Sequence, residues 1–150
     1  MAATPLEPRR GLKVFISHAG RDTWVALRIA EKIRELGART FLDETDIAIG
    51  EDFEARILKE IQSCDEFLVL LTPWSLDREY VLSEIGAAAV KCMPIIGVVY
   101  GWGADELGAK LVLPPFVGKR NLVDLNDLDR YLRELARRIE AGAGGGDRDD

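Results

Sequence analysis

Short apolar runs alternate along the chain with stretches whose apolar residues recur every three or four positions. Apolar runs of four to eight residues predict strands, and recurrence at the helical period predicts amphipathic helices. The runs are Leu12 to Ser17, Arg39 to Asp43, Asp65 to Thr72, Pro94 to Tyr100 and a short fifth candidate, Asn121 to Leu125. The pattern therefore predicts five strands, each separated from the next by a helix or a loop.

Four stretches have helical spacing. The first follows Asp22, which we expect to be its N-cap, and Gly37 is expected to end it. The second places Phe53, Ile57 and Ile61 on one stripe. The third covers Ser75 to Cys92, and the fourth carries Leu128, Leu132, Leu135 and Ile139.

Alternation of strands and helices predicts an α/β fold of the flavodoxin-like kind, a three-layer sandwich. Its central sheet would be parallel and five-stranded, with helices on both faces. The third and fourth strands are apolar without interruption, as expected for strands buried on both faces. Ligands of such open sheets bind outside the carboxyl ends of the strands, here residues 17–21, 43–52, 72–77 and 100–103.

Composition limits the classes of partner. A chain of 150 residues is expected to form one domain, and its net charge of -6 argues against a nucleic-acid backbone as the main partner. No apolar run approaches the roughly 20 residues of a membrane-spanning helix. Cys64 and Cys92 are not closely spaced, and we expect both to be small buried hydrophobic residues in a cytoplasmic protein.

The two ends of the chain differ from its middle. Residues 1–11 have no apolar core of the signal-peptide kind and are expected to be a disordered segment. The folded domain is expected at residues 12–140. Residues 141–150 are glycine and charge without periodicity, which indicates a flexible tail or the start of a linker.

Several kinds of site are disfavoured by spacing. The chain has neither a complete G-x-G-x-x-G fingerprint nor a P-loop, and the acidic loop that includes Asp43 lacks the calcium-binding spacing. Ser17 and His18 are neighbours on a strand, so their side chains point to opposite faces and cannot easily form a triad. With one histidine in the chain, no metal site is expected.

Glu84 is the most unusual charged residue, because Tyr80 to Val90 is otherwise apolar or small at nearly every position. It lies too far into the helix for the helix dipole to explain it. One interpretation is a solvated carboxylate at the sheet edge, paired with an arginine or near Lys91. The other is a carboxylate at the lip of a cleft, beside the ring of Tyr80, that stabilises the cation formed when a glycosidic bond breaks.

Three blocks favour the second interpretation. The stretches "VFISHAGRD", "FLDETDIAIGEDF" and "LLTPWSLDREYVLSEIGAA", in this order and spacing, resemble the Toll/interleukin receptor (TIR) domain of the bacterial type. The resemblance covers about residues 12–139. Enzymatic members of that family cleave nicotinamide from NAD, and the match places their catalytic glutamate on Glu84. In those enzymes the residue four positions earlier is commonly tryptophan, and here it is Tyr80.

The resemblance also implies substrate contacts and partners. It assigns Ser17 and His18 to the pocket lining, Phe53 to the loop aromatic and Asp43 to a familiar position, and Trp74 joins them as a candidate at the same edge. NAD+ would be the substrate, with no separate cofactor, and the products would be nicotinamide and ADP-ribose or a cyclic form. Self-assembly with other TIR copies would activate the enzyme, in bacterial antiviral defence, under a sensor domain beyond the tail.

Two rival functions remain open. The first is a non-catalytic TIR scaffold that only recruits other TIR domains. The second is a nucleotide-sugar transferase, which would need a second carboxylate near Glu84, with Asp77 and Glu79 as the candidates.

Overall fold

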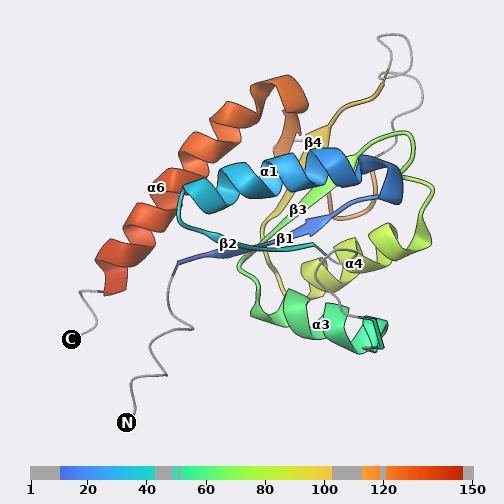
Figure 1. Cartoon of the computed structure of the whole chain (residues 1–150), viewed down its shortest axis with the longest axis horizontal. Helices are drawn as coiled ribbons and strands as arrows, with labels where there is room; N and C mark the ends of the chain where they lie inside the picture. The colour runs from blue at the N-terminus through green and yellow to red at the C-terminus, as the bar shows by residue number, and fades with distance from the viewer. Residues whose placement is uncertain (1–10, 43–48, 51, 103–112, 119–120, 147–150) are drawn as a thin grey trace.

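The computed structural model describes residues 11–42, 49–50, 52–102, 113–118 and 121–146. All five predicted strands are present and parallel, in the order β2-β1-β3-β4-β5. They are β1 Lys13–Ser17, β2 Arg39–Leu42, β3 Glu66–Leu71, β4 Ile95–Val99 and β5 Leu122–Asp124. The predicted flavodoxin-like architecture is confirmed (Figure 1).

Helices cover both faces of this sheet. In the described ranges they are α1 Thr23–Glu35, α3 Phe53–Ser63, α4 Glu79–Val90 and α6 Leu128–Gly146, with short 3-10 turns η2 Gly20–Asp22 and η4 Leu125–Asp127. Helices α1 and α6 lie on one face, and α3 and α4 lie on the other (Figure 1). Because the chain goes from β1 outward to β2 and then returns to β3 on the other side of β1, the strand order reverses between β1 and β3.

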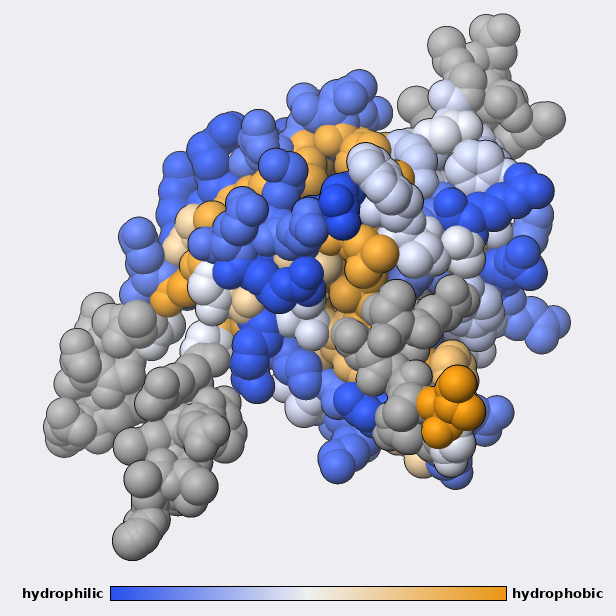
Figure 2. Space-filling model, viewed as in Figure 1, coloured by the Kyte–Doolittle hydropathy of each residue, from blue (hydrophilic) through white to orange (hydrophobic). Residues whose placement is uncertain are grey.

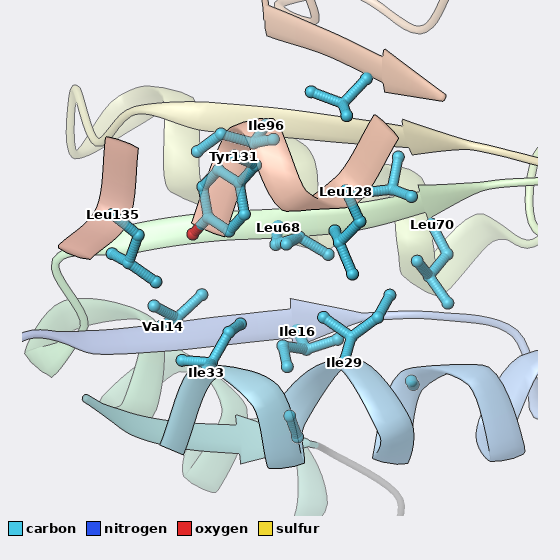
Figure 3. Packing of buried hydrophobic residues seen from close by; sticks show 14 of the residues in the cluster. Val14, Ile16, Ile29, Ile33, Leu68, Leu70, Ile96, Leu128, Tyr131 and Leu135 are labelled. Carbon is cyan, nitrogen blue, oxygen red and sulfur yellow. The ribbon is translucent and has the colours of Figure 1, made fainter. Parts of the chain in front are cut away.

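The alternation of side chains along each strand creates two cores. Val14 and Ile16 of β1 join Leu68 and Leu70 of β3 against α1 and α6, as Figure 3 shows. The intervening residues form the opposite core, where the ring of Phe15 lies 5.3 Å from those of both Phe41 and Phe67. Residues one apart on β1 therefore face different pairs of helices.

Two local predictions are wrong, and a third is confirmed in position only. Helix α4 begins at Glu79, not Ser75, because Ser75 is buried in a turn where its Oγ donates to the carbonyl of Leu70 at 2.6 Å. Asp22 occupies the N-cap position of α1 as predicted, but its side chain is buried elsewhere and makes no capping hydrogen bond. Cys92 is exposed and has φ 63 at the end of α4, whereas Cys64 is buried as predicted.

The last helix is longer than its apolar spacing indicates. It continues through Gly146, beyond the expected domain end at residue 140, and residues 147–150 lie outside the described part of the chain. Between α1 and α6 an apolar seam reaches the surface amid polar side chains (Figure 2). Over the residues that the structure describes, no helix has the length and apolarity to cross a bilayer.

Candidate active site

Glu84 lies on the buried face of α4. It occupies one position of the stripe Val81, Glu84, Ile85 and Ala88, whose members are spaced to face the sheet. Only 4% of its surface is exposed. A solvated carboxylate at the sheet edge is therefore excluded. Since burial of an unpaired carboxylate costs several kcal/mol, Glu84 needs hydrogen-bond donors.

The last residue of β1 supplies a donor. Ser17 Oγ donates to Glu84 Oε1 at 2.6 Å, and both side chains are buried. Ser17 faces α4 because it alternates in phase with Phe15, which belongs to the core under α3 and α4. The end of β1 thus fixes the carboxylate of a helix that covers this face of the sheet.

A second bond joins the same two elements. The hydroxyl of Tyr80 donates to the backbone carbonyl of His18 at 2.9 Å. The ring of His18 is buried, and its Nε2 lies 3.3 Å from Thr23 Oγ1 on the side of α1. Ser17 and His18 therefore point to opposite faces, which confirms that they do not form a catalytic pair.

A cavity of about 340 Å³ opens between α3 and α4. Glu84 and Tyr80 lie on one wall, and apolar side chains of α3 form the other. The lining residues are Phe53, Glu54, Ile57, Leu58, Ile61, Tyr80, Ser83, Glu84 and Ala87. A buried, hydrogen-bonded carboxylate beside an aromatic ring and an apolar wall can hold a sugar hydroxyl and stabilise positive charge on its ring.

The predicted site residues take different places around this cavity. Phe53 lines it and is 42% exposed, so it does not pack in the stripe with Ile57 and Ile61. Ser17 and His18 are fully buried and contact the lining residues instead of the cavity itself. Trp74 lines a separate hollow of about 310 Å³, and Asp43 lies outside the described residues.

The candidate second carboxylates of a transferase do not join Glu84. Asp77 lines the hollow of Trp74, and Glu79 is exposed at the start of α4. A carboxylate that the sequence reasoning missed, Glu54 of α3, lines the cavity of Glu84 from its rim. Within the described ranges, no group of three His, Cys, Asp or Glu side chains could hold a metal ion.

A buried polar cluster beside the site was also missed. Asp22 Oδ2 accepts from Thr72 Oγ1 at 2.7 Å, and Asp22 Oδ1 accepts from the hydroxyl of Tyr100 at 2.5 Å. Burial, together with the hydrogen bond to Asp22, raises the pKa of the Tyr100 hydroxyl. The cluster joins η2 to the carboxyl ends of β3 and β4. Its sequence signal is a polar residue directly after each of those two strands, Thr72 and Tyr100.

Lys91 links the two helices that form the cavity. Its Nζ donates to the carbonyls of Cys64 at 2.6 Å and Ile61 at 3.3 Å, and also to that of Gln62. These carbonyls lie at the C-terminal end of α3, where a cation is favoured. Lys91 therefore joins α3 to α4, and its ammonium is directed to α3 instead of to Glu84.

Known proteins resemble this chain over nearly its whole length. The sequence profile of the TIR domain matches residues 14–139. A protein of Brachypodium distachyon, named "Probable 2' cyclic ADP-D-ribose synthase BdTIR", is 31% identical over 132 residues. That alignment covers 85% of this chain but only 57% of the relative, so the chain spans little more than half of the relative's length.

Solved structures resemble the fold. The TIR domain of the Toll-related receptor TRR-2 of Hydra magnipapillata aligns with a TM-score of 0.65 and 23% identity, covering 85% of this chain and 97% of that one. The TIR domains of the activated Roq1 resistosome align with a TM-score of 0.57 and 16% identity, covering 87% and 98%. By sequence profile and by fold, this chain belongs to the TIR domain family.

Proposed function

We propose that this TIR domain is an NAD+ nucleosidase that breaks the bond between nicotinamide and ribose, with Glu84 as the catalytic residue. One observation carries the proposal: the carboxylate of Glu84 is buried, held by Ser17, and lines an open cavity beside Tyr80. The name of the plant relative, a probable synthase of a cyclic ADP-ribose, supports the same chemistry.

The proposed reaction needs a stabilised cation more than an acid. When the glycosidic bond breaks, its electron pair goes to the ring nitrogen of nicotinamide, which leaves as a neutral molecule. The ribose becomes oxocarbenium-like, and the carboxylate of Glu84 stabilises that charge and accepts a hydrogen bond from a ribose hydroxyl. Ser17 keeps the carboxylate in place while the charge develops.

Capture of the ribosyl cation decides the product. If the oxygen of water adds to the anomeric carbon and releases a proton, the products are nicotinamide, ADP-ribose and a proton. If a nucleophile within the same molecule adds instead, the product is a cyclic ADP-ribose. The relative's name favours testing for the cyclic form first.

Tyr80 and Phe53 would hold the substrate's ring systems. The hydroxyl of Tyr80 is bound to the carbonyl of His18, so the orientation of its ring is fixed on one wall of the cavity. Phe53 has 42% of its surface exposed at the cavity, which leaves its ring able to stack on a ligand. We expect the loss of either ring to raise KM.

We also propose that self-association activates the enzyme. Three large apolar side chains close to the cavity are exposed: Ile49 fully, Leu58 at 55% and Phe53 at 42%. Exposed apolar residues clustered at one place favour an interface. A second TIR copy would cover these side chains and close the cavity. Activation by assembly would suit an enzyme of bacterial immune defence.

Nicotinamide release tests the proposal against the scaffold alternative. The protein, concentrated or fused to an oligomerising domain, is incubated with NAD+, and nicotinamide and ADP-ribose products are separated by chromatography. We expect nicotinamide in equal amount to the NAD+ consumed, and more of it from the clustered protein. A clustered, folded protein that consumes no NAD+ would support the scaffold function instead.

A further inference from the structure

Two arginine side chains line the hollow around Trp74, and the proposed reaction uses neither of them. Arg21 comes from η2, and Arg78 is the residue that precedes α4. Both line the hollow of about 310 Å³ together with Pro73, Trp74 and Asp77. In a chain of net charge -6, two arginines and one carboxylate give this place a net charge of about +1.

Among the residues that the structure describes, neither arginine has its charge neutralised by a carboxylate. Across the described part of the chain, neither guanidinium forms an ion pair with a carboxylate. Arg78 occupies the N-cap position of α4 without making a capping hydrogen bond, at the end of the helix where the dipole disfavours a cation. Charged residues placed against local preference are expected at binding sites.

Trp74 holds this hollow in a fixed shape. The guanidinium of Arg21 lies over its ring, 5.9 Å from the centroid. The ring also meets Gly101, where an added Cβ would be 3.2 Å from it, and the backbone N–H of Trp74 donates to Thr72 Oγ1 at 3.3 Å. The indole therefore positions Arg21 before any ligand arrives.

The hollow lies on the same edge of the sheet as the cavity of Glu84. Arg78 and Glu84 are six residues apart, and Tyr80 of the next turn lines the cavity. At a rise of about 1.5 Å per residue, the two positions are about 9 Å apart along the helix. In a nicotinamide dinucleotide the diphosphate is bonded directly to the ribose that carries nicotinamide. A diphosphate site must therefore lie close to the site of that ribose.

We propose that Arg21 and Arg78, which line one hollow with Trp74, bind the diphosphate of the dinucleotide whose nicotinamide ribose Glu84 holds. This inference rests on the function proposed above. Planar guanidinium groups donate paired hydrogen bonds to phosphate oxygens, which suits two arginines that face one hollow. The indole of Trp74 acts as a positioning residue for Arg21.

Direct binding of ADP tests the site without any catalysis. Calorimetry at low salt compares the parent with Arg21→Gln and Arg78→Gln, and adenosine serves as the probe without phosphate. We expect each substitution to weaken ADP binding about tenfold, as for loss of one charge-assisted hydrogen-bond pair, and adenosine to bind far more weakly than ADP. Trp74→Ala should weaken ADP binding more than Trp74→Phe, which keeps a ring under Arg21.

Two controls distinguish this site from its surroundings. Arg133→Gln removes an exposed arginine of α6 and should leave ADP binding unchanged. Arg137→Gln removes a second exposed arginine of α6 and should also bind ADP like the parent. Parent-like ADP binding by both Arg21→Gln and Arg78→Gln, or no ADP binding by the parent, would overturn the inference.

The same experiments separate this inference from the proposed function. If ADP binding needs both arginines but the clustered protein consumes no NAD+, the diphosphate site stands and the nucleosidase proposal fails. If NAD+ is consumed but the arginine variants bind ADP like the parent, the nucleosidase stands and the diphosphate lies elsewhere.

Discussion

Ser17 Oγ lies 2.6 Å from Glu84 Oε1, and this buried hydrogen bond joins residues that are 67 positions apart in the chain. It connects the carboxyl end of β1 to the middle of α4, the helix that lines the cavity. A carboxylate that accepts a hydrogen bond from a fixed hydroxyl keeps one orientation, which is what a group that stabilises a developing cation needs.

Replacement of Ser17 by alanine should lower kcat without unfolding the protein. The hydrogen bond to a charged group is expected to contribute about 1.5–3 kcal/mol, so kcat should fall about tenfold or more. Ser17→Thr keeps a hydroxyl and should retain more activity. Steady-state rates of nicotinamide release measure both variants, and a Ser17→Ala variant with the parent's kcat would show that the bond does not orient Glu84.

The Asp22 cluster should be a source of stability. Asp22→Ala leaves the buried hydroxyls of Thr72 and Tyr100 without their acceptor, so we expect a loss of about 2–4 kcal/mol in the free energy of unfolding. Tyr100→Phe should cost about 1–2 kcal/mol. Urea unfolding of both single variants and the double variant gives their coupling, and simple additivity of the two losses would contradict a shared hydrogen bond.

Stability should fall in acid partly through Glu60. Burial alone would raise the pKa of Glu60, but hydrogen bonds and charge from Lys13 and Arg56 outweigh it and hold that pKa below its ordinary range. A depressed pKa contributes stability above the unfolded-state value of about 4.3, and this is lost as pH falls through the folded value.

The variant Glu60→Gln isolates this effect. Near neutral pH it should be less stable than the parent. The difference should begin to shrink as pH falls below the unfolded-state pKa of about 4.3, and it should be lost as pH falls further, through the lowered pKa of Glu60 in the folded parent. Urea unfolding of both proteins at several pH values measures the difference. A difference that stays constant from neutral pH to acid would mean that Glu60 is not the titrating group.

The two cysteines should react very differently. Burial raises the pKa of the Cys64 thiol to about 12, whereas Cys92 is exposed after α4. The thiolate is the reactive form, so a thiol reagent at mildly alkaline pH should label one cysteine in the folded protein and two in urea. Cys92→Ser should leave none reactive in the folded state. Rapid labelling of that variant would contradict the burial of Cys64.

The sequence predicts what is local and misses what depends on long-range contacts. Strand runs and helical stripes recur within a few residues, so the succession of strands along the chain and the apolar stripe of α6 could be predicted. The Asp22 cluster could not, because Asp22 also suits the local role of an N-cap, and only the fold brings Tyr100 to it from 78 positions away. The predicted start of α4 was wrong for a local reason, because the Oγ of Ser75 bonds the carbonyl of Leu70 five residues earlier and holds a turn there.

Within the site, the resemblance to the TIR family identified Glu84 and Tyr80. The structure explains their orientation, because Ser17 holds Glu84 and the carbonyl of His18 holds Tyr80. Phe53 fits the periodicity of a core stripe, yet it is the first residue of α3 and lies half-exposed at the cavity. No spacing rule indicates that Lys91 would bind the end of α3, since its partners are backbone carbonyls without a sequence signature.

The most direct test of this account is NAD+ consumption by the clustered protein beside Glu84→Gln, with Glu79→Gln as the matched control. Both substitutions remove one negative charge from α4, but Glu84 lines the cavity and Glu79 is exposed at the start of the helix. With folding checked by circular dichroism, the account predicts that the parent and Glu79→Gln release nicotinamide and Glu84→Gln loses at least about a hundredfold in kcat, as for removal of a main electrostatic group. Equal rates of nicotinamide release from Glu84→Gln and the parent would contradict it.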